Sequence, residues 1–242
     1  MMLKAIDKSI DYLSVKDSIV RNLRVQIICG DLSPKQKLNE LELASKFNVS
    51  RPPLREAFRT LESDHLISNN PRRGCSVTEM SVRDFREILS ARQMLECAAV
   101  DLIEEKGKKY LPEVALTLET TARLHLPFGE DPFEKYEYLR AIAEFHFKLM
   151  ESADNSRIFK FYNSIFLNLA RYQSLYVYIP GLMERSQNEH EGILKSIKRG
   201  SYSKTRQLLK NHIQSFTHYV ESGLEKIQQT QSKMTNISSP GS

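Results

Sequence analysis

Residues 38–67 read LNELELASKFNVSRPPLREAFRTLESDHLI, and this stretch decides the fold. Apolar residues recur at spacings of three and four over 39–47 and again over 51–63, so each segment is predicted to form an amphipathic helix. Only Asn48, Val49 and Ser50 separate the two segments, and two helices joined by so short a link must cross sharply. The stretch therefore predicts a helix-turn-helix.

The neighbouring segments complete a winged-helix pattern. An apolar face over 15–29 predicts a preceding helix that stops at Gly30, a common residue just past a helix end. Short strand-like runs at 66–68 and 75–78 flank the polar loop 69–74, which predicts a hairpin. Residues 1–78 are therefore predicted to form a winged helix-turn-helix domain.

From residue 79 onward the pattern changes to long helices, so the fold class is mainly α. The apolar spacing predicts helices over 81–107, 110–125, 132–152, 155–178, 182–199 and 202–228. Ser81, with Asp84 three residues later, predicts a capping box at the start of the first of these helices. We predict an all-helical bundle over 79–230 and a disordered polar tail over 231–242.

Composition narrows the class of protein. Of the 242 residues, 27% are charged and 40% hydrophobic, as in ordinary globular proteins. Residues 1–78 carry 13 Lys and Arg against 9 Asp and Glu, which suits an anionic partner but also describes a plain solvated surface. Cys29, Cys75 and Cys97 are odd in number and widely spaced, and the chain lacks a signal-peptide pattern or a membrane-length apolar run. These features favour the cytoplasm.

Arginines on the second helix of the helix-turn-helix carry the DNA-binding hypothesis. Arg51, Arg55 and Arg59 are four residues apart, so they form one ridge beside the apolar stripe. A recognition helix enters the major groove with its N-terminal residues nearest the bases. We expect Arg51 and Arg55 to reach guanine edges or phosphates, and Arg59 to reach phosphates. The alternative is a solvent face paired with Glu56 and Glu62.

The start of this helix and the hairpin supply further candidates. The Ser50 hydroxyl is expected to cap the helix, and Pro53 fits its first turn. In the hairpin, Gly74 follows two arginines and lets the wing approach the DNA backbone or minor groove closely. The predicted DNA-binding residues are Ser50, Arg51, Pro53, Arg55, Arg59, Arg72, Arg73 and Gly74.

Residues 15–78 resemble the winged-helix signature of the GntR family of bacterial transcription regulators. The resemblance rests on the Leu-Ala pair at 43–44, the Val-Ser-Arg turn at 49–51, the Leu-Arg-Glu-Ala helix at 54–57 and the Arg-Gly wing at 73–74. In that family the residues matching Arg51, Arg55 and Gly74 approach DNA. The chain departs from the family pattern by Pro52 in place of a threonine, Leu41 in place of an arginine and His65 in place of a glycine.

Residues 79–228 resemble the helical effector-binding domain of the FadR-like branch of that family, the FCD domain. The motifs are RQMLE at 92–96, FH at 145–146, HEGIL at 190–194 and NHI at 211–213. The resemblance implies that His146, His190 and His212 hold a divalent metal, zinc or nickel, and that a small carboxylate effector completes its coordination. Ile142 stands where metal-binding members have an aspartate, so the anionic ligand is missing. The alternative is a set of core histidines that hydrogen-bond within the pocket.

Arg92 of the first motif is the candidate effector-binding residue. Its guanidinium can neutralise an effector carboxylate, and the alternative is a structural salt bridge with Glu96 one turn later.

The resemblance also implies a homodimer on a palindromic operator, in which effector binding changes the relative orientation of the two winged helices. The sequence leaves repression and activation open. An enzyme with a catalytic metal site is disfavoured, because no Glu or Asp stands at a recognisable spacing from the histidines as a general base. A helical adaptor that binds protein rather than DNA is the third reading.

Overall fold

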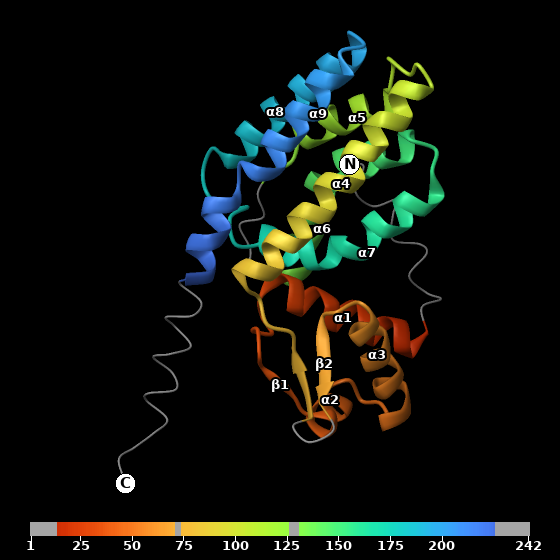
Figure 1. The fold of residues 1–242 in the computed structure, drawn as a ribbon. Helices are drawn as coiled ribbons and strands as arrows, with labels where there is room; N and C mark the ends of the chain where they lie inside the picture. The colour runs from red at the N-terminus through yellow and green to blue at the C-terminus, as the bar shows by residue number, and fades with distance from the viewer. Residues whose placement is uncertain (1–13, 71–73, 126–130, 226–242) are drawn as a thin grey trace. The chain divides into compact units, whose positions relative to one another are not determined.

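The computed structural model describes residues 14–70, 74–125 and 131–225 of the chain. It consists of two compact units, residues 1–79 and 80–242 (Figure 1). The predicted tail at 231–242 and the end of the last predicted helix lie outside the described residues.

The N-terminal unit combines helices with a small antiparallel sheet. Its elements are α1 (Val15–Cys29), β1 (Lys37–Leu38), α2 (Glu40–Lys46), α3 (Arg51–Ser63), β2 (Ile67–Asn70) and β3 (Gly74–Val77). Strand β3 lies in the middle of the sheet, with the order β1-β3-β2. The predicted hairpin strands are thus confirmed, and β1, which the sequence analysis missed, pairs Lys37 with Ser76.

Buried leucines hold this unit together. Helix α3 packs against both α1 and α2, and Leu23, Leu54, Leu61 and Leu66 have no exposed surface. Ser14 caps α1 by accepting a hydrogen bond from the backbone N–H of Asp17. The unit therefore has its own core, which fixes α3 with one face inward.

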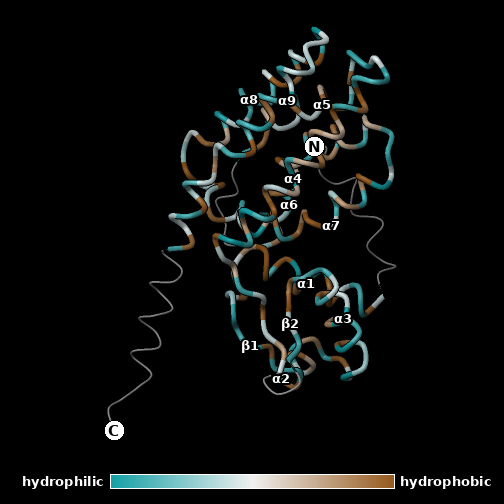
Figure 2. The backbone as a smooth tube through the Cα atoms, viewed as in Figure 1, coloured by the Kyte–Doolittle hydropathy of each residue, from teal (hydrophilic) through white to brown (hydrophobic). Residues whose placement is uncertain are grey.

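The second unit is an all-helical bundle. Its elements are α4 (Val82–Glu105), α5 (Pro112–Thr121), α6 (Pro132–Ser152), α7 (Ser156–Gln173), α8 (Leu182–Lys198) and α9 (Tyr202–Gln214), and residues 217–225 are also helical. Helix α4 packs against α6, α7 and α9, and α8 packs against α9. Figure 2 shows hydrophobic and hydrophilic residues alternating along these helices. The mainly α fold class is confirmed.

Polar contacts at the start of α4 join it to α7. The Ser81 hydroxyl accepts the N–H of Asp84 at 3.1 Å, so the predicted cap is present. The Tyr172 hydroxyl donates to Asp84 Oδ2 at 2.6 Å. Burial raises the pKa of Tyr172, and the bond to Asp84 adds to that effect. The phenol therefore keeps its proton and fixes the first turn of α4.

Three predicted helices end earlier than expected, and the first is α5, which ends at Thr121 rather than at 125. Helix α7 stops at Gln173 rather than at 178, and the helix predicted over 202–228 is interrupted at residues 215–216. At the end of α7 and at the interruption, a serine hydroxyl donates a hydrogen bond to the carbonyl oxygen three residues earlier. Ser174 donates to Arg171, and Ser215 donates to His212. Such local bonds compete with the regular helical ladder, and the apolar spacing alone does not reveal them.

Candidate functional sites

The start of α3 is fixed by two prolines rather than by its serine. Ser50 is the N-cap residue, with φ −72° and ψ 166°, but its side chain makes no capping hydrogen bond. An N-cap oxygen normally accepts from the second or third helical residue. Those residues are Pro52 and Pro53, which lack an N–H. The predicted hydroxyl cap is therefore wrong, and the exposed Ser50 hydroxyl stays available for another partner.

The arginine ridge of α3 faces away from the core. Its apolar stripe is buried (Leu54, Ala57, Phe58 and Leu61), while Arg51, Arg55 and Arg59 are all exposed. Arg51 and Arg59 form no ion pair with a described acidic residue. The ridge thus presents cations to solvent beside the buried stripe.

Arg55 has a partner on another helix. Its Nε donates to Glu40 Oε2 at 3.0 Å, and the arginine side chain remains 60% exposed. Glu40 is the first residue of α2. The pairing with Glu56 or Glu62 considered from the sequence does not occur for this arginine. Because an exposed ion pair is weak, Arg55 can exchange Glu40 for a phosphate or a base edge.

The wing lies partly outside the described residues, which exclude Arg72 and Arg73. Gly74, the first residue of β3, is exposed and has φ +80°, a conformation that favours glycine. His65, which follows α3, has φ +58°. The glycine that the family has at that position would adopt this conformation without strain.

Three buried histidines from three helices meet inside the second unit. His146 lies on α6, His190 on α8 and His212 on α9, and their exposed fractions are 2%, 4% and 4%. The three Nε2 atoms form a triangle: 3.1 Å from His190 to each of the others and 3.2 Å from His146 to His212. We call these residues the histidine cluster.

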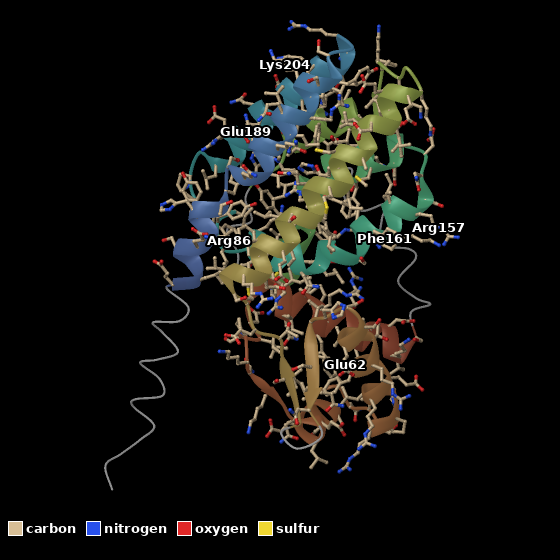
Figure 3. All side chains as sticks on the ribbon, viewed as in Figure 1. Glu62, Arg86, Arg157, Phe161, Glu189 and Lys204 are labelled. Carbon is tan, nitrogen blue, oxygen red and sulfur yellow. The ribbon has the colours of Figure 1, made fainter. Side chains whose placement is uncertain are left out.

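Carboxylates on the outer side of two rings determine their tautomers. His146 Nδ1 lies 2.9 Å from Glu96 Oε2, and His212 Nδ1 lies 2.8 Å from Glu189 Oε2. An ionised carboxylate only accepts hydrogen bonds, so each Nδ1 carries the proton and each Nε2 presents its lone pair. Glu189 lies on α8 next to His190 in the chain (Figure 3).

Burial keeps these imidazoles neutral. It lowers the pKa of His146, and the Arg92 guanidinium lowers it further. The pKa values of His190 and His212 are also lowered, in both cases chiefly by burial. Burial alone would raise the pKa of Glu96, but its partners His146 and Arg92 outweigh that effect and lower it. The cluster therefore combines neutral rings with ionised carboxylates.

Arg92 joins the histidine cluster directly. Its Nε donates to Glu96 Oε1 at 2.7 Å, and its Nη2 donates to His146 Nε2, also at 2.7 Å. Arg92 is 4% exposed. The salt bridge to Glu96 considered from the sequence is present, and the contact with His146 was not anticipated.

The spacing of the cluster fits a divalent ion. Tetrahedral coordination with metal–nitrogen bonds of about 2.0–2.1 Å separates ligand atoms by roughly 3.3–3.4 Å, and octahedral coordination by roughly 2.8–3.0 Å. The observed 3.1–3.2 Å lies between these values. His146, His190 and His212 can therefore hold a metal through Nε2, with Glu96 and Glu189 orienting the rings.

Sequence reasoning missed Glu96 and Glu189 as partners of the histidines. Glu96 was visible in the RQMLE motif, and Glu189 precedes His190, but contact between helices cannot be read from spacing along the chain. Ile142, one turn before His146, is half-buried and supplies no ligand atom.

Comparison with known families identifies the chain. Residues 15–77 match the family described as bacterial regulatory proteins, gntR family, and residues 87–215 match the FCD domain. The second match alone covers more than half of the chain. This protein belongs to the GntR family and carries an FCD domain. As a GntR-family member it is a DNA-binding transcription regulator and not an enzyme.

Individual relatives agree with this assignment. The HTH-type transcriptional regulator YdhC of Bacillus subtilis (strain 168) is 35% identical over 137 residues, 56% of this chain and 59% of YdhC. The HTH-type transcriptional repressor RspR of Escherichia coli (strain K12) is 40% identical over 84 residues, 35% of this chain and 37% of RspR. Both alignments span less than two thirds of the relative.

A solved structure has the same fold. The transcriptional regulator GntR from Rhodococcus sp. RHA1 aligns with a TM-score of 0.67 at 22% identity, covering 86% of this chain and 98% of that one. Within the described part of this GntR-family chain, no helix is both long and apolar enough to cross a membrane.

Proposed function

We propose that this regulator acts as a homodimer, in which residues 1–78 bind a palindromic operator and residues 79–230 bind a small carboxylate effector. Effector binding changes operator affinity by changing the relative orientation of the two DNA-binding units. The observation that carries the effector proposal is the buried histidine cluster with the Arg92 guanidinium beside it. The name of the relative RspR makes repression the proposed direction.

In the proposed DNA complex, α3 lies in the major groove. Arg51 and Arg55 contact base edges or phosphates from its first turns, and Arg59 contacts phosphate one turn further on. The Ser50 hydroxyl, which no cap engages, and the N-terminal turn with Pro53 lie beside the backbone. The wing residues Arg72, Arg73 and Gly74 reach the backbone or the minor groove. Half-sites about one DNA turn, roughly 34 Å, apart match the dimer.

The DNA proposal is tested by selecting bound sequences from random duplexes with the full chain. Replacing Arg51 and Arg55 together by alanine should weaken binding of the selected duplex at least about 30-fold, since each base-contacting arginine contributes about 1–3 kcal/mol. Arg83→Ala is the matched control, because Arg83 is an exposed arginine of α4 that pairs with Glu87 on its own helix. Equal binding by the double variant and the control would contradict the assignment of α3.

In the proposed effector site, His146, His190 and His212 hold a zinc or nickel ion. When bound, the ion supplies positive charge that attracts carboxylate oxygens of the effector. Arg92 supplies a second positive group for the same carboxylate. Ile142 contributes no charge, so this chain depends on neutral imidazoles where related proteins add an aspartate.

The effector proposal is tested with full-length protein purified without a metal-affinity tag. Elemental analysis should find about one zinc or nickel per chain, and His190→Gln should lose it. His218→Gln is the matched control, because His218 is exposed. A panel of small carboxylates is then titrated against the protein on its selected duplex. The proposal fails if no carboxylate changes duplex affinity with or without added metal.

A further inference from the structure

The histidine cluster lies against a cation of this chain, the Arg92 guanidinium. We propose that Arg92 donates a hydrogen bond to the Nε2 lone pair of His146, which a metal ion would need, and thereby lowers the affinity of the histidine cluster for metal. The inference rests on the proposed metal site and deepens it. Arg92 then competes with the ion for His146, in addition to its proposed role in binding the effector carboxylate.

Arg92 and a metal ion compete because His146 Nε2 has only one lone pair. A neutral imidazole with its proton on Nδ1 has one lone pair, on Nε2, and that pair serves either one hydrogen-bond donor or one metal ion. Glu96 holds the proton on Nδ1 of His146, and Arg92, which can only donate, lies 2.7 Å from Nε2. The lone pair that a metal would need is therefore already engaged.

Arg92 is held in this position from two sides. Its Nε donates to Glu96 Oε1, while Glu96 Oε2 accepts from His146. The three side chains close a ring in which each member contacts the other two. All three are buried, with exposed fractions of 4% for Arg92, 0% for Glu96 and 2% for His146. Because the guanidinium cannot lose its proton in a protein, it remains a donor whenever it stays in the ring.

His190 and His212 can form a hydrogen bond with each other through their Nε2 atoms. His212 has its proton on Nδ1, directed at Glu189, so its Nε2 accepts. His190 Nε2 lies 3.1 Å from His212 Nε2, and this contact is a hydrogen bond when His190 carries its proton on Nε2. Arg92 and His190 together then provide donors for both lone pairs. The hydrogen bonds of the cluster then form a closed network, and a metal ion must displace Arg92.

Replacing Arg92 tests the proposal. The zinc and nickel affinities of full-length, untagged protein are measured by competition with a chromophoric chelator. Arg92→Met removes both the charge and the donors while keeping a long side chain, and it should bind metal at least tenfold more tightly than the wild type. Mutating a group that supports a metal ligand typically costs 10–100-fold in affinity, and removing a competing group should change the affinity by a similar factor in the opposite direction. Arg83→Met, on the exposed side of α4, should bind metal like the wild type.

A second variant covers the case in which Arg92→Met leaves Glu96 too poorly paired to fold. Arg92→Gln removes the charge while its amide N–H can still pair with Glu96, and it should also bind metal more tightly than the wild type. Circular dichroism checks that each variant folds. If the wild type binds metal and neither Arg92 variant binds more tightly, the competition is refuted while the metal site stands. If no folded variant binds metal, the metal site and the competition both fail.

A crystal of the wild type with zinc gives an independent readout. Arg92 Nη2 should have left hydrogen-bond distance of His146 Nε2 once the ion is bound. Finding the ion on the three histidines with Arg92 still 2.7 Å from that nitrogen would overturn the proposal.

Discussion

Acidification should destabilise the metal-free helical unit through the histidine cluster. Burial lowers the pKa values of His146, His190 and His212 in the folded protein. In the unfolded chain each histidine titrates near its ordinary pKa of about 6.5. Below that pH the unfolded state binds more protons than the folded state, so the free energy of unfolding falls. The stabilisation is present above about pH 6.5 and is lost as the pH falls toward the lowered folded-state values.

The size of the effect follows from the number of buried rings. Between pH 7 and 5.5 an unfolded histidine of pKa about 6.5 gains most of a proton, which is worth about 1.3 kcal/mol. If all three rings stay neutral in the folded state over this interval, they give at most about 4 kcal/mol, which is a large part of the roughly 5–15 kcal/mol that stabilises a typical domain. Glu96 and Glu189 have lowered pKa values as well. Their unfolded forms protonate only below about pH 5, so this interval isolates the histidines.

Urea unfolding of chelator-treated protein measures the change. Far-ultraviolet circular dichroism follows the helical unit, and a loss of about 4 kcal/mol lowers its urea midpoint by roughly 2 M for a slope of about 2 kcal/mol per molar urea. His190→Gln is the matched variant, because its amide N–H can replace the imidazole donor without titrating. Because it removes one titrating ring, it should lose less stability than the wild type over the same interval, by up to about 1.3 kcal/mol.

An unfolding midpoint that is the same at pH 7 and 5.5 would refute this reasoning. So would an equal pH dependence in the wild type and in His190→Gln, because the effect would then arise elsewhere than in the buried cluster.

Three further substitutions probe separate features. Ile142→Asp restores a carboxylate one turn before His146, so it should raise zinc or nickel affinity in chelator competition at least tenfold, and lower the thermal stability of the metal-free protein. His65→Gly relieves a positive φ and should raise the free energy of unfolding by about 0.5–1 kcal/mol in urea titrations. Tyr172→Phe removes the hydroxyl bound to Asp84 and should cost about 1–2 kcal/mol in thermal unfolding; an unchanged midpoint would show that the bond adds nothing.

The sequence predicted the helices of the DNA-binding unit well because their signals are local. Helix α3 spans Arg51–Ser63, the range expected from its apolar stripe and its prolines. Strand β1 has no comparable signal. It is two residues long and exists only because Lys37 and Leu38 pair with Ser76 and Cys75, nearly forty residues away. Strands this far apart in the chain pair only once the unit has folded, so the spacing of apolar residues does not predict β1.

The capping of α3 shows where a general preference fails in a particular context. Serine is a favoured N-cap residue, and Ser50 does occupy that position. The hydroxyl needs an N–H to accept from, and both candidate residues are prolines. The identity of the two following residues was available in the sequence, so this error was avoidable.

The sequence predicted which histidines form the cluster, but it did not predict their contacts. The apolar stripes around His190 and His212 indicated that both point inward, and all three histidines are buried. Their Nδ1 partners and the contact between Arg92 and His146 join α4, α6, α8 and α9 across long stretches of chain. Such contacts depend on how the helices pack, which spacing within one helix does not fix.

Arg92 and Ile142 both affect the balance of charge around the histidine cluster. Arg92 balances the charge of Glu96, and Arg185 balances that of Glu189 at 2.9 Å, so the charged groups around the three neutral rings are paired. An aspartate at position 142 would add a further negative charge to this partly buried face, and unpaired buried charge is costly. Isoleucine avoids that cost in the metal-free state, but it gives up the attraction that an aspartate would provide for the ion. The same two residues thus favour a stable metal-free cluster and a weaker metal site, which is why Arg92→Met and Ile142→Asp should both raise metal affinity and should do so by different routes.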